Sequence, residues 1–176
     1  MVNAVTARSP LDERSADLDG LDGRELAFVS QLDVRMDPST AASQGFPTAP
    51  NTATTTGDRD VLWLGPDEWL VVGAPGAAGS IDAELGSSLA GLHHSVVDVS
   101  ANRVLIELAG PSRHDLLSSA CPIDLHPRSW SDGRCAQSVF GAAQVLLHER
   151  ERATRLFVRP SFAKYVVDLL LAASRP

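Results

Sequence analysis

The chain has 176 residues, a length that suits one domain or two fused half-domains. It carries 15 basic and 22 acidic residues and a formal net charge of −7, which argues against nucleic acid or an anionic membrane as a default partner. Two cysteines are too few for a secreted disulfide scaffold, and no apolar run approaches the ~20 residues that span a bilayer. No signal-peptide pattern opens the chain, so we expect a cytoplasmic protein.

The first part of the chain divides into an arm and a set of short elements. Residues 1–23 mix polar and small residues without sustained periodicity, which predicts a flexible N-terminal arm. Loose alternation predicts a strand over 28–36, and Pro38 opens a short helix over 38–44. Residues 47–57, rich in Thr, Pro and Asn, are expected to form a loop.

Residues 61–73 read as a β-hairpin, because two apolar segments flank the turn-forming sequence Gly-Pro-Asp-Glu. Turn chemistry also explains the neighbouring acids Asp67 and Glu68 without a catalytic role. After a glycine-rich breaker, Ser80 is the expected N-cap of a helix over 81–92.

The second half shows similar patterns in a similar order. They predict a strand within 95–109, a helix over 111–120, a hairpin from 137–148 and 154–158 joined by the charged run 148–152, and a helix over 162–173 capped by Ser161. Residues 24–176 are therefore predicted to form one α+β domain. It would contain a duplicated strand–helix–hairpin–helix unit, with halves at about 28–95 and 96–174.

Two cysteines and a histidine in the middle of the chain raise the question of metal or thiol chemistry. Cys121 and Cys135 are fourteen residues apart with His126 between them, whereas zinc ligands usually come in closer pairs. Cys135 follows Arg134, but no base is identifiable for a catalytic thiol. We expect both cysteines to be small buried hydrophobic residues and no metal site.

Phosphate-binding loops are missing from the sequence. It contains neither GxGxxG nor GxxxxGK, so no pattern for a flavin, nicotinamide or nucleotide phosphate is present. Trp63, Trp69 and Trp130 could stack on a planar ligand. Because Trp63 and Trp69 fall on hairpin strands, core packing is the expected use of these two.

Four segments together resemble the gamma subunit of heterotetrameric sarcosine oxidase: residues 64–70, 97–103, 121–127 and 133–137. The resemblance extends from about Ser30 to Ser174. It implies a small structural subunit in a complex that demethylates sarcosine to glycine, with hydrogen peroxide and methylenetetrahydrofolate as products. It also implies alpha, beta and delta subunits as partners, with FAD, FMN and NAD in the larger subunits rather than in this chain.

A second resemblance lies within the first. The segment from Asp98 through the helix that ends in Leu116-Leu117 is similar to the start of the folate-binding domain of glycine-cleavage aminomethyltransferases. That family implies an acidic pair in the next segment, where residues 141–148 here hold neutral Ala and Gln. A neutral side chain cannot replace a carboxylate that orients or deprotonates an amine. A free-standing tetrahydrofolate-binding protein is therefore the alternative, and an adaptor for an unrelated partner is a third possibility.

No catalytic, cofactor-binding or metal-binding residue is predicted in this chain. The expected docking surface is the segment of residues 121–137, which we call the connector. The candidate interface residues are Asp124, His126, Arg128, Trp130 and Arg134. Tryptophan and arginine contribute disproportionately to binding energy in desolvated contacts. For Arg134 an equally good interpretation is that it ties the loop to its own domain.

Overall fold

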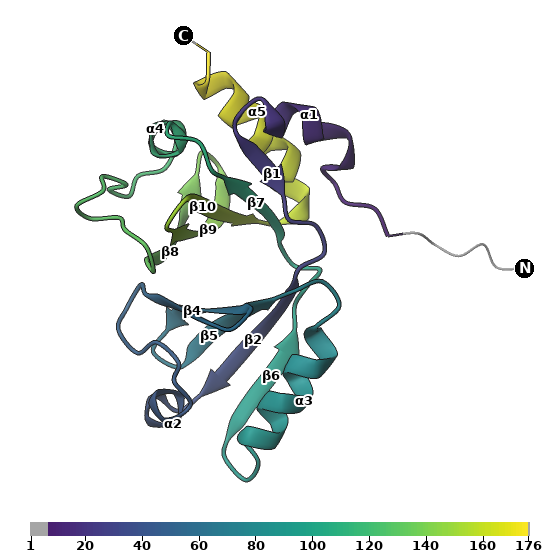
Figure 1. Cartoon of the computed structure of the whole chain (residues 1–176), viewed down its shortest axis with the longest axis vertical. Coiled ribbons are helices and arrows are strands. Elements are labelled where there is room, and N and C mark those ends of the chain that lie inside the picture. The colour runs from purple at the N-terminus through teal and green to yellow at the C-terminus, as the bar shows by residue number, and fades with distance from the viewer. Residues whose placement is uncertain (1–6, 176) are drawn as a thin grey trace, which may run out of the picture.

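The computed structural model describes residues 7–175. Two five-stranded antiparallel sheets lie back to back across the middle of the molecule, and helices cover their outer faces (Figure 1). We call them the N-terminal sheet, with strand order β3-β4-β5-β2-β6, and the C-terminal sheet, with strand order β1-β7-β10-β9-β8. None of the helices within residues 7–175 is long and apolar enough to cross a membrane.

The N-terminal sheet is built from one continuous part of the chain. Its elements in chain order are β2 (Ser30–Met36), α2 (Pro38–Ser43), β3 (Ala53–Thr56), β4 (Arg59–Gly65), β5 (Glu68–Gly73), α3 (Ala78–Ser88) and β6 (His94–Asp98). The predicted hairpin over 61–73 is confirmed as β4 and β5. Asp37 caps α2, because its carboxylate accepts a hydrogen bond from the Ser39 N–H at 2.8 Å.

The C-terminal sheet combines the second half of the chain with its beginning. Its elements are β1 (Gly23–Glu25), β7 (Val104–Leu108), α4 (Arg113–Ser118), β8 (Cys135–Phe140), β9 (Ala143–Arg150), β10 (Ala153–Val158), the 3-10 turn η2 (Pro160–Phe162) and α5 (Ala163–Ala173). The turn η1 (Asp12–Arg14) and helix α1 (Ser15–Asp19) precede β1, and Figure 1 shows α1 beside α5.

The α+β prediction is confirmed, and the two sheets have corresponding strand orders. Read from the edge that holds β3, the N-terminal sheet runs β3-β4-β5-β2-β6; read from β8, the C-terminal sheet runs β8-β9-β10-β7-β1. The predicted unit is wrong in two respects. Each half contains an extra strand before its hairpin, and β6, which crosses the expected boundary at residue 95, belongs to the N-terminal sheet through its pairing with β2.

Several local predictions are corrected by the strands. The expected loop over 47–57 contains β3, and the expected single strand over 137–148 turns back at Gly141, where φ is +57°. The charged run 148–152 is not a loop throughout, because His148 and Glu149 are buried members of β9. The side chains of these two residues face the interior.

The predicted serine caps are also wrong. Helix α3 begins at Ala78 with Ala77 as its N-cap, so Ser80 lies inside the helix and donates to the Ala77 carbonyl at 2.9 Å. Helix α5 begins at Ala163 after η2, so Ser161 lies in that turn instead of capping the helix. Serine bonding to a carbonyl one turn back is the alternative to capping that this side chain commonly adopts.

The N-terminal arm is ordered over its described residues, which corrects the prediction for 1–23; residues 1–6 lie outside the described part. Leu11, Leu18 and Leu21 are buried in the core above the C-terminal sheet. Arg14 pairs with Asp168 of α5 at 2.6 Å, and β1 pairs with β7. The segment folds because three leucines remove apolar surface from water.

Three cores follow from this arrangement. One lies between the C-terminal sheet and its helices, one between the N-terminal sheet and α2 and α3, and one between the two sheets. Every residue of β7 is buried as a result, including Glu107, although its alternation with the apolar Ile106 and Leu108 is the pattern of a strand with one exposed face. Trp69 is fully buried and donates its indole N–H to the Pro47 carbonyl at 2.7 Å, and Trp63 packs against the same core, so the predicted core role of both is confirmed.

Candidate subunit interface

The segment between α4 and β8 is fastened at its end to both sheets. The Gly133 carbonyl accepts from the N–H of Ala53, the first residue of β3 in the N-terminal sheet, at 2.7 Å. The Arg134 carbonyl accepts from the N–H of Glu149 in β9 at 2.8 Å. The Cys135 N–H donates to the Asn51 carbonyl at 3.0 Å. These backbone bonds make the end of the connector part of the junction between the sheets.

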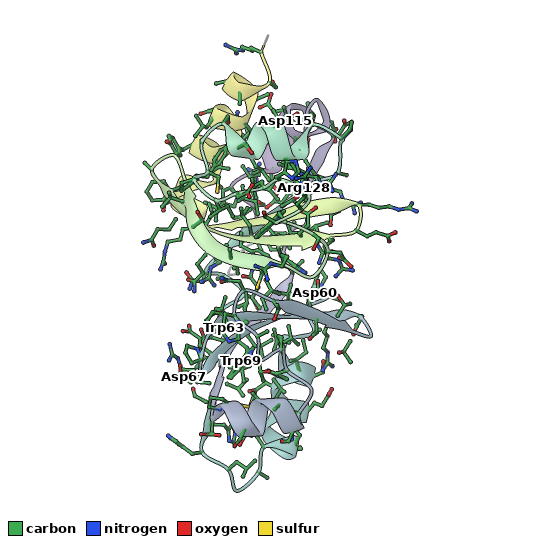
Figure 2. All side chains as sticks on the ribbon, turned by 90° about the vertical axis from the view of Figure 1, so that its left-hand side faces the viewer. Asp60, Trp63, Asp67, Trp69, Asp115 and Arg128 are labelled. Carbon is green, nitrogen blue, oxygen red and sulfur yellow. The ribbon has the colours of Figure 1, made fainter. Side chains whose placement is uncertain are left out.

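Three of the five predicted interface residues lie on the surface of the connector: Asp124, His126 and Arg128 are exposed. Hydrogen bonds from the Ser129 side chain and the His126 N–H hold the pKa of Asp124 below its ordinary value. The ring nitrogen Nδ1 of His126 accepts from the Arg128 N–H at 3.2 Å. These local bonds give the exposed loop a defined shape, and Figure 2 shows Arg128 in the half of the molecule that holds the C-terminal sheet.

The other two predicted interface residues face inward. Trp130 is only 5% exposed, and its indole Nε1–H donates to Oε2 of Glu149 at 2.8 Å. Its proposed role as an exposed anchor is therefore corrected: the ring is part of this chain's own core. Arg134 is half-buried, and its backbone carries the β9 contact, which agrees with the interpretation that it ties the loop to its own domain.

Glu149 is the centre of a buried polar cluster that sequence reasoning missed. Its carboxylate pairs with Arg113 at 2.9 Å and with the His114 ring at 3.0 Å, both on α4. It also accepts hydrogen bonds from Trp130 and from the Thr154 hydroxyl. A buried carboxylate is stable only when paired and hydrogen-bonded, so this group holds α4, the connector, β9 and β10 together.

A second buried cluster crosses from one sheet to the other. Asp60 of β4 pairs with Arg150 of β9 and Arg155 of β10, and Figure 2 shows Asp60 where the two sheets meet. Arg155 also pairs with Glu107 at 3.0 Å, and Arg24 of β1 pairs with Glu107 at 2.6 Å. Burial raises the pKa of Glu107, but its bonds to both arginines outweigh burial and leave the pKa below its ordinary value.

The cysteines have the buried positions that were predicted for them. Burial raises the pKa of the Cys135 thiol to about 11, which opposes thiolate formation, and the thiol contacts the Thr52 carbonyl at 3.2 Å. Cys121 is buried beside the Ser138 hydroxyl. Within residues 7–175, no group of three or more His, Cys, Asp or Glu side chains is placed to hold a metal ion.

The segment expected to carry an acidic pair begins with the β8–β9 turn. Gly141 and Ala142 form this turn, Ala143 is buried, and Gln144 is exposed at the start of β9. The buried carboxylates of Glu149, toward the other end of β9, and of Asp60 in β4 are each paired with arginine. Residues 141–148 therefore hold no carboxylate that could act as a base.

Sequence relatives cover most of the chain. The family model described as sarcosine oxidase, gamma subunit family, matches residues 38–175. Sarcosine oxidase subunit gamma from Arthrobacter sp. is 35% identical over 160 residues, which is 85% of this chain and 78% of that protein. The subunit gamma from Corynebacterium sp. (strain U-96) is 32% identical over 182 residues, with 97% of this chain and 84% of that protein covered.

Solved structures agree with these relatives. A chain of heterotetrameric sarcosine oxidase from Corynebacterium sp. U-96, solved with pyrrole 2-carboxylate, matches with a TM-score of 0.84 and 31% identity over 95% of this chain and 94% of that chain. Glycine cleavage system aminomethyltransferase T from Bartonella henselae shares the fold, with a TM-score of 0.67 and 12% identity over 89% of this chain and 48% of that chain. The chain belongs to the sarcosine oxidase gamma subunit family.

Proposed function

We propose that this chain is the gamma subunit of a heterotetrameric sarcosine oxidase, in which it packs against larger subunits and contributes structure rather than chemistry. The observation that carries the proposal is the match along 95% of the chain to a component of such a complex, at 31% identity.

The internal use of the charged residues supports a structural role. The buried carboxylates Asp60, Glu107 and Glu149 are each paired with arginine, and Cys135 is held as a thiol by burial. A general base or nucleophile needs a group that is free to exchange a proton with a substrate. In this proposal the alpha, beta and delta subunits are the partners, and FAD, FMN and NAD reside in the larger ones.

The exposed part of the connector is the proposed docking surface. Asp124, His126 and Arg128 project from a loop that is anchored at Trp130 and at Arg134, so a partner would meet a surface that is already shaped. Preorganisation of this kind reduces the entropy that is lost on association.

Co-expression with the companion subunits tests the proposal. Arg128→Glu should lower the amount of this chain that co-purifies with the large subunits, because reversing a charge within an interface opposes docking. Arg152→Glu is the matched control, since Arg152 is exposed in the β9–β10 turn and has no ion pair within the described residues. Equal recovery of both variants and the parent would remove the connector as the docking surface, and no co-purification of the parent would remove the subunit role itself.

The fold shared with an aminomethyltransferase supports one alternative, a tetrahydrofolate-binding protein that acts alone. The neutral side chains of Ala142 and Gln144 oppose it. Calorimetric titration of the purified chain with tetrahydrofolate separates the two functions. Micromolar binding would favour the alternative, whereas the subunit proposal expects no heat of binding.

A further inference from the structure

A polar pocket of about 290 Å³ opens at one end of the C-terminal sheet. The ion pairs of Asp60 with Arg150 and Arg155 lie farther along the same strands. The wall of the pocket includes Gln137 of β8 and Gln144 of β9, together with Arg103 just before β7 and Arg159 just after β10. Gln137 ends the connector and donates to the Leu64 carbonyl at 3.0 Å, whereas the proposed subunit role uses none of Arg103, Gln144 and Arg159.

The two arginines stand opposite each other in the strand register. Along the β7–β10 pair, Arg155 faces Glu107, then Phe157 faces Leu105, and Val158 faces Val104. The next position of the same ladder brings Arg159 opposite Arg103, and the backbone of Arg159 is still extended, with φ −60° and ψ 142°. Like charges directly opposite each other destabilise a sheet, whereas the Arg155–Glu107 pair four positions away is complementary.

No carboxylate compensates this pair of cations at close range. Within residues 7–175 neither guanidinium has an ion pair; Arg159 donates only to the Asn102 side chain at 2.9 Å. Burial and the charge of Arg159 lower the pKa of Arg103, and the more weakly acting carboxylates of Asp33 and Glu68 do not reverse this direction. Among the described residues, the two guanidinium groups therefore have no carboxylate within ion-pair distance, and Asp33 and Glu68 act on Arg103 only from farther away.

We propose that this pocket binds a carboxylate group between Arg103 and Arg159. A planar guanidinium offers two parallel N–H donors to a carboxylate, and the exposed amide of Gln144 is a further donor on the wall. The volume is at the lower end of ligand pockets, which suits a small acid or a single acidic side chain. The carboxylate therefore belongs either to a free small acid or to an Asp or Glu of a companion subunit.

Titration of the full chain with acetate, followed by NMR, tests the pocket independently of the proposed function. We expect saturable shifts of the backbone amides at 103, 144 and 159. In Arg103→Gln/Arg159→Gln, binding should be at least about tenfold weaker, because charge-assisted hydrogen bonds are lost. Arg152→Gln/Arg175→Gln, at two exposed arginines outside the pocket, is the control with the same change of charge, and it should bind like the parent. Equal acetate binding by parent and double variant would overturn the proposal.

Stability without added anion provides a second readout. Since Arg159 repels Arg103 in the empty pocket, Arg159→Gln should leave the melting temperature in low salt unchanged or raise it. A fall of several degrees would mean that Arg159 is structural and would contradict the proposal.

Two further arms identify the source of the carboxylate. If a companion subunit supplies it, the assembled complex should not bind acetate at this pocket, and the double variant should co-purify less. If a free acid supplies it, the complex should still bind acetate and assembly should be unchanged. Acetate binding by neither the free chain nor the complex, with normal assembly of the double variant, would also overturn the proposal.

Discussion

Trp130 and Glu149 meet inside the molecule: the indole Nε1–H donates to the carboxylate Oε2 at 2.8 Å, and both side chains are buried. Nineteen residues separate them, and this bond fixes the connector onto β9. The residue that the sequence suggested as an interface anchor is thus an internal anchor, and the exposed loop before it takes its shape from this bond. Stability and assembly can therefore be separated by mutation.

Trp130→Phe should lower the free energy of unfolding by about 1–3 kcal/mol, because it keeps an aromatic ring but removes the donor to Glu149. Trp130→Ala should cost about 3–5 kcal/mol, since it also leaves a cavity. Urea denaturation of the purified chain measures both. Arg128→Ala, on the exposed part of the connector, should stay within about 0.5 kcal/mol of the parent. A stable Trp130→Ala chain that fails to assemble would instead support a direct interface role.

Asp60→Asn should destabilise the chain by about 3 kcal/mol, because Arg150 loses its partner and Arg155 keeps only Glu107. The ion pairs that are lost are those that join the two sheets. Asp58→Asn is the matched control. Because the Asp58 side chain is 78% exposed, loss of its charge should change the free energy of unfolding very little. Guanidinium denaturation compares the two variants, and equal stability would show that the inter-sheet pairs are energetically neutral.

The stability of the chain should fall as the pH is lowered from 7 to 5, and His148 supplies part of this fall. Burial lowers the pKa of His148 to about 4 from the ordinary 6.5; the charges of Arg155 and Arg150 act in the same direction, and those of Asp60 and Asp132 oppose them. Between these two pH values only the unfolded chain binds the proton. The contribution of His148 to the free energy of unfolding is therefore complete above pH 6.5 and is lost as the pH falls toward 4. The expected loss from pH 7 to pH 5 is about 2 kcal/mol.

The prediction for His148 is tested by the slope of the free energy of unfolding against pH, rather than by its absolute value. Urea denaturation at pH 7, 6 and 5 should give a shallower slope for His148→Leu than for the parent. His93→Gln, at an exposed histidine, should keep the slope of the parent. If His148→Leu and the parent show parallel slopes, the histidine is not the group responsible.

Gly141→Ala should lower the stability by more than about 2 kcal/mol. The turn requires φ +57°, and an added Cβ would lie 2.8 Å from Leu169 Cδ2 and closer still to the Tyr165 hydroxyl. Gly57→Ala separates strain from collision, because Gly57 has φ +61° but nothing within 4 Å of the added Cβ. Thermal unfolding should show the smaller loss for Gly57→Ala; losses of equal size would mean that α5 moves aside easily.

Local chemistry explains the parts that were predicted correctly. The hairpin of β4 and β5 follows from a Gly-Pro turn between two apolar segments, and α5 follows from apolar residues three and four apart. The burial of both cysteines follows from the chemistry of a free thiol. Each of these features depends on residues that are close in sequence or on the residue type alone.

The buried charges could not be predicted in the same way. Asp60 and Arg155 are separated by 95 residues, and Arg113 and Glu149 by 36, so no local period connects them. The one available sign was a charged residue inside an apolar strand, as at Glu107, where alternation suggested an exposed face. That face is covered by the other sheet, which only the tertiary arrangement reveals.

The α+β class, the main hairpin and the resemblance to one family can be predicted from the sequence, because they depend on turn residues, local periodicity and segments that can be compared directly. The burial of Leu11, Leu18 and Leu21, the inward position of Trp130 and the register that brings Arg103 opposite Arg159 follow from the tertiary arrangement. These outcomes depend on which strands become neighbours, and that is determined by burial summed over the whole chain rather than by any one segment.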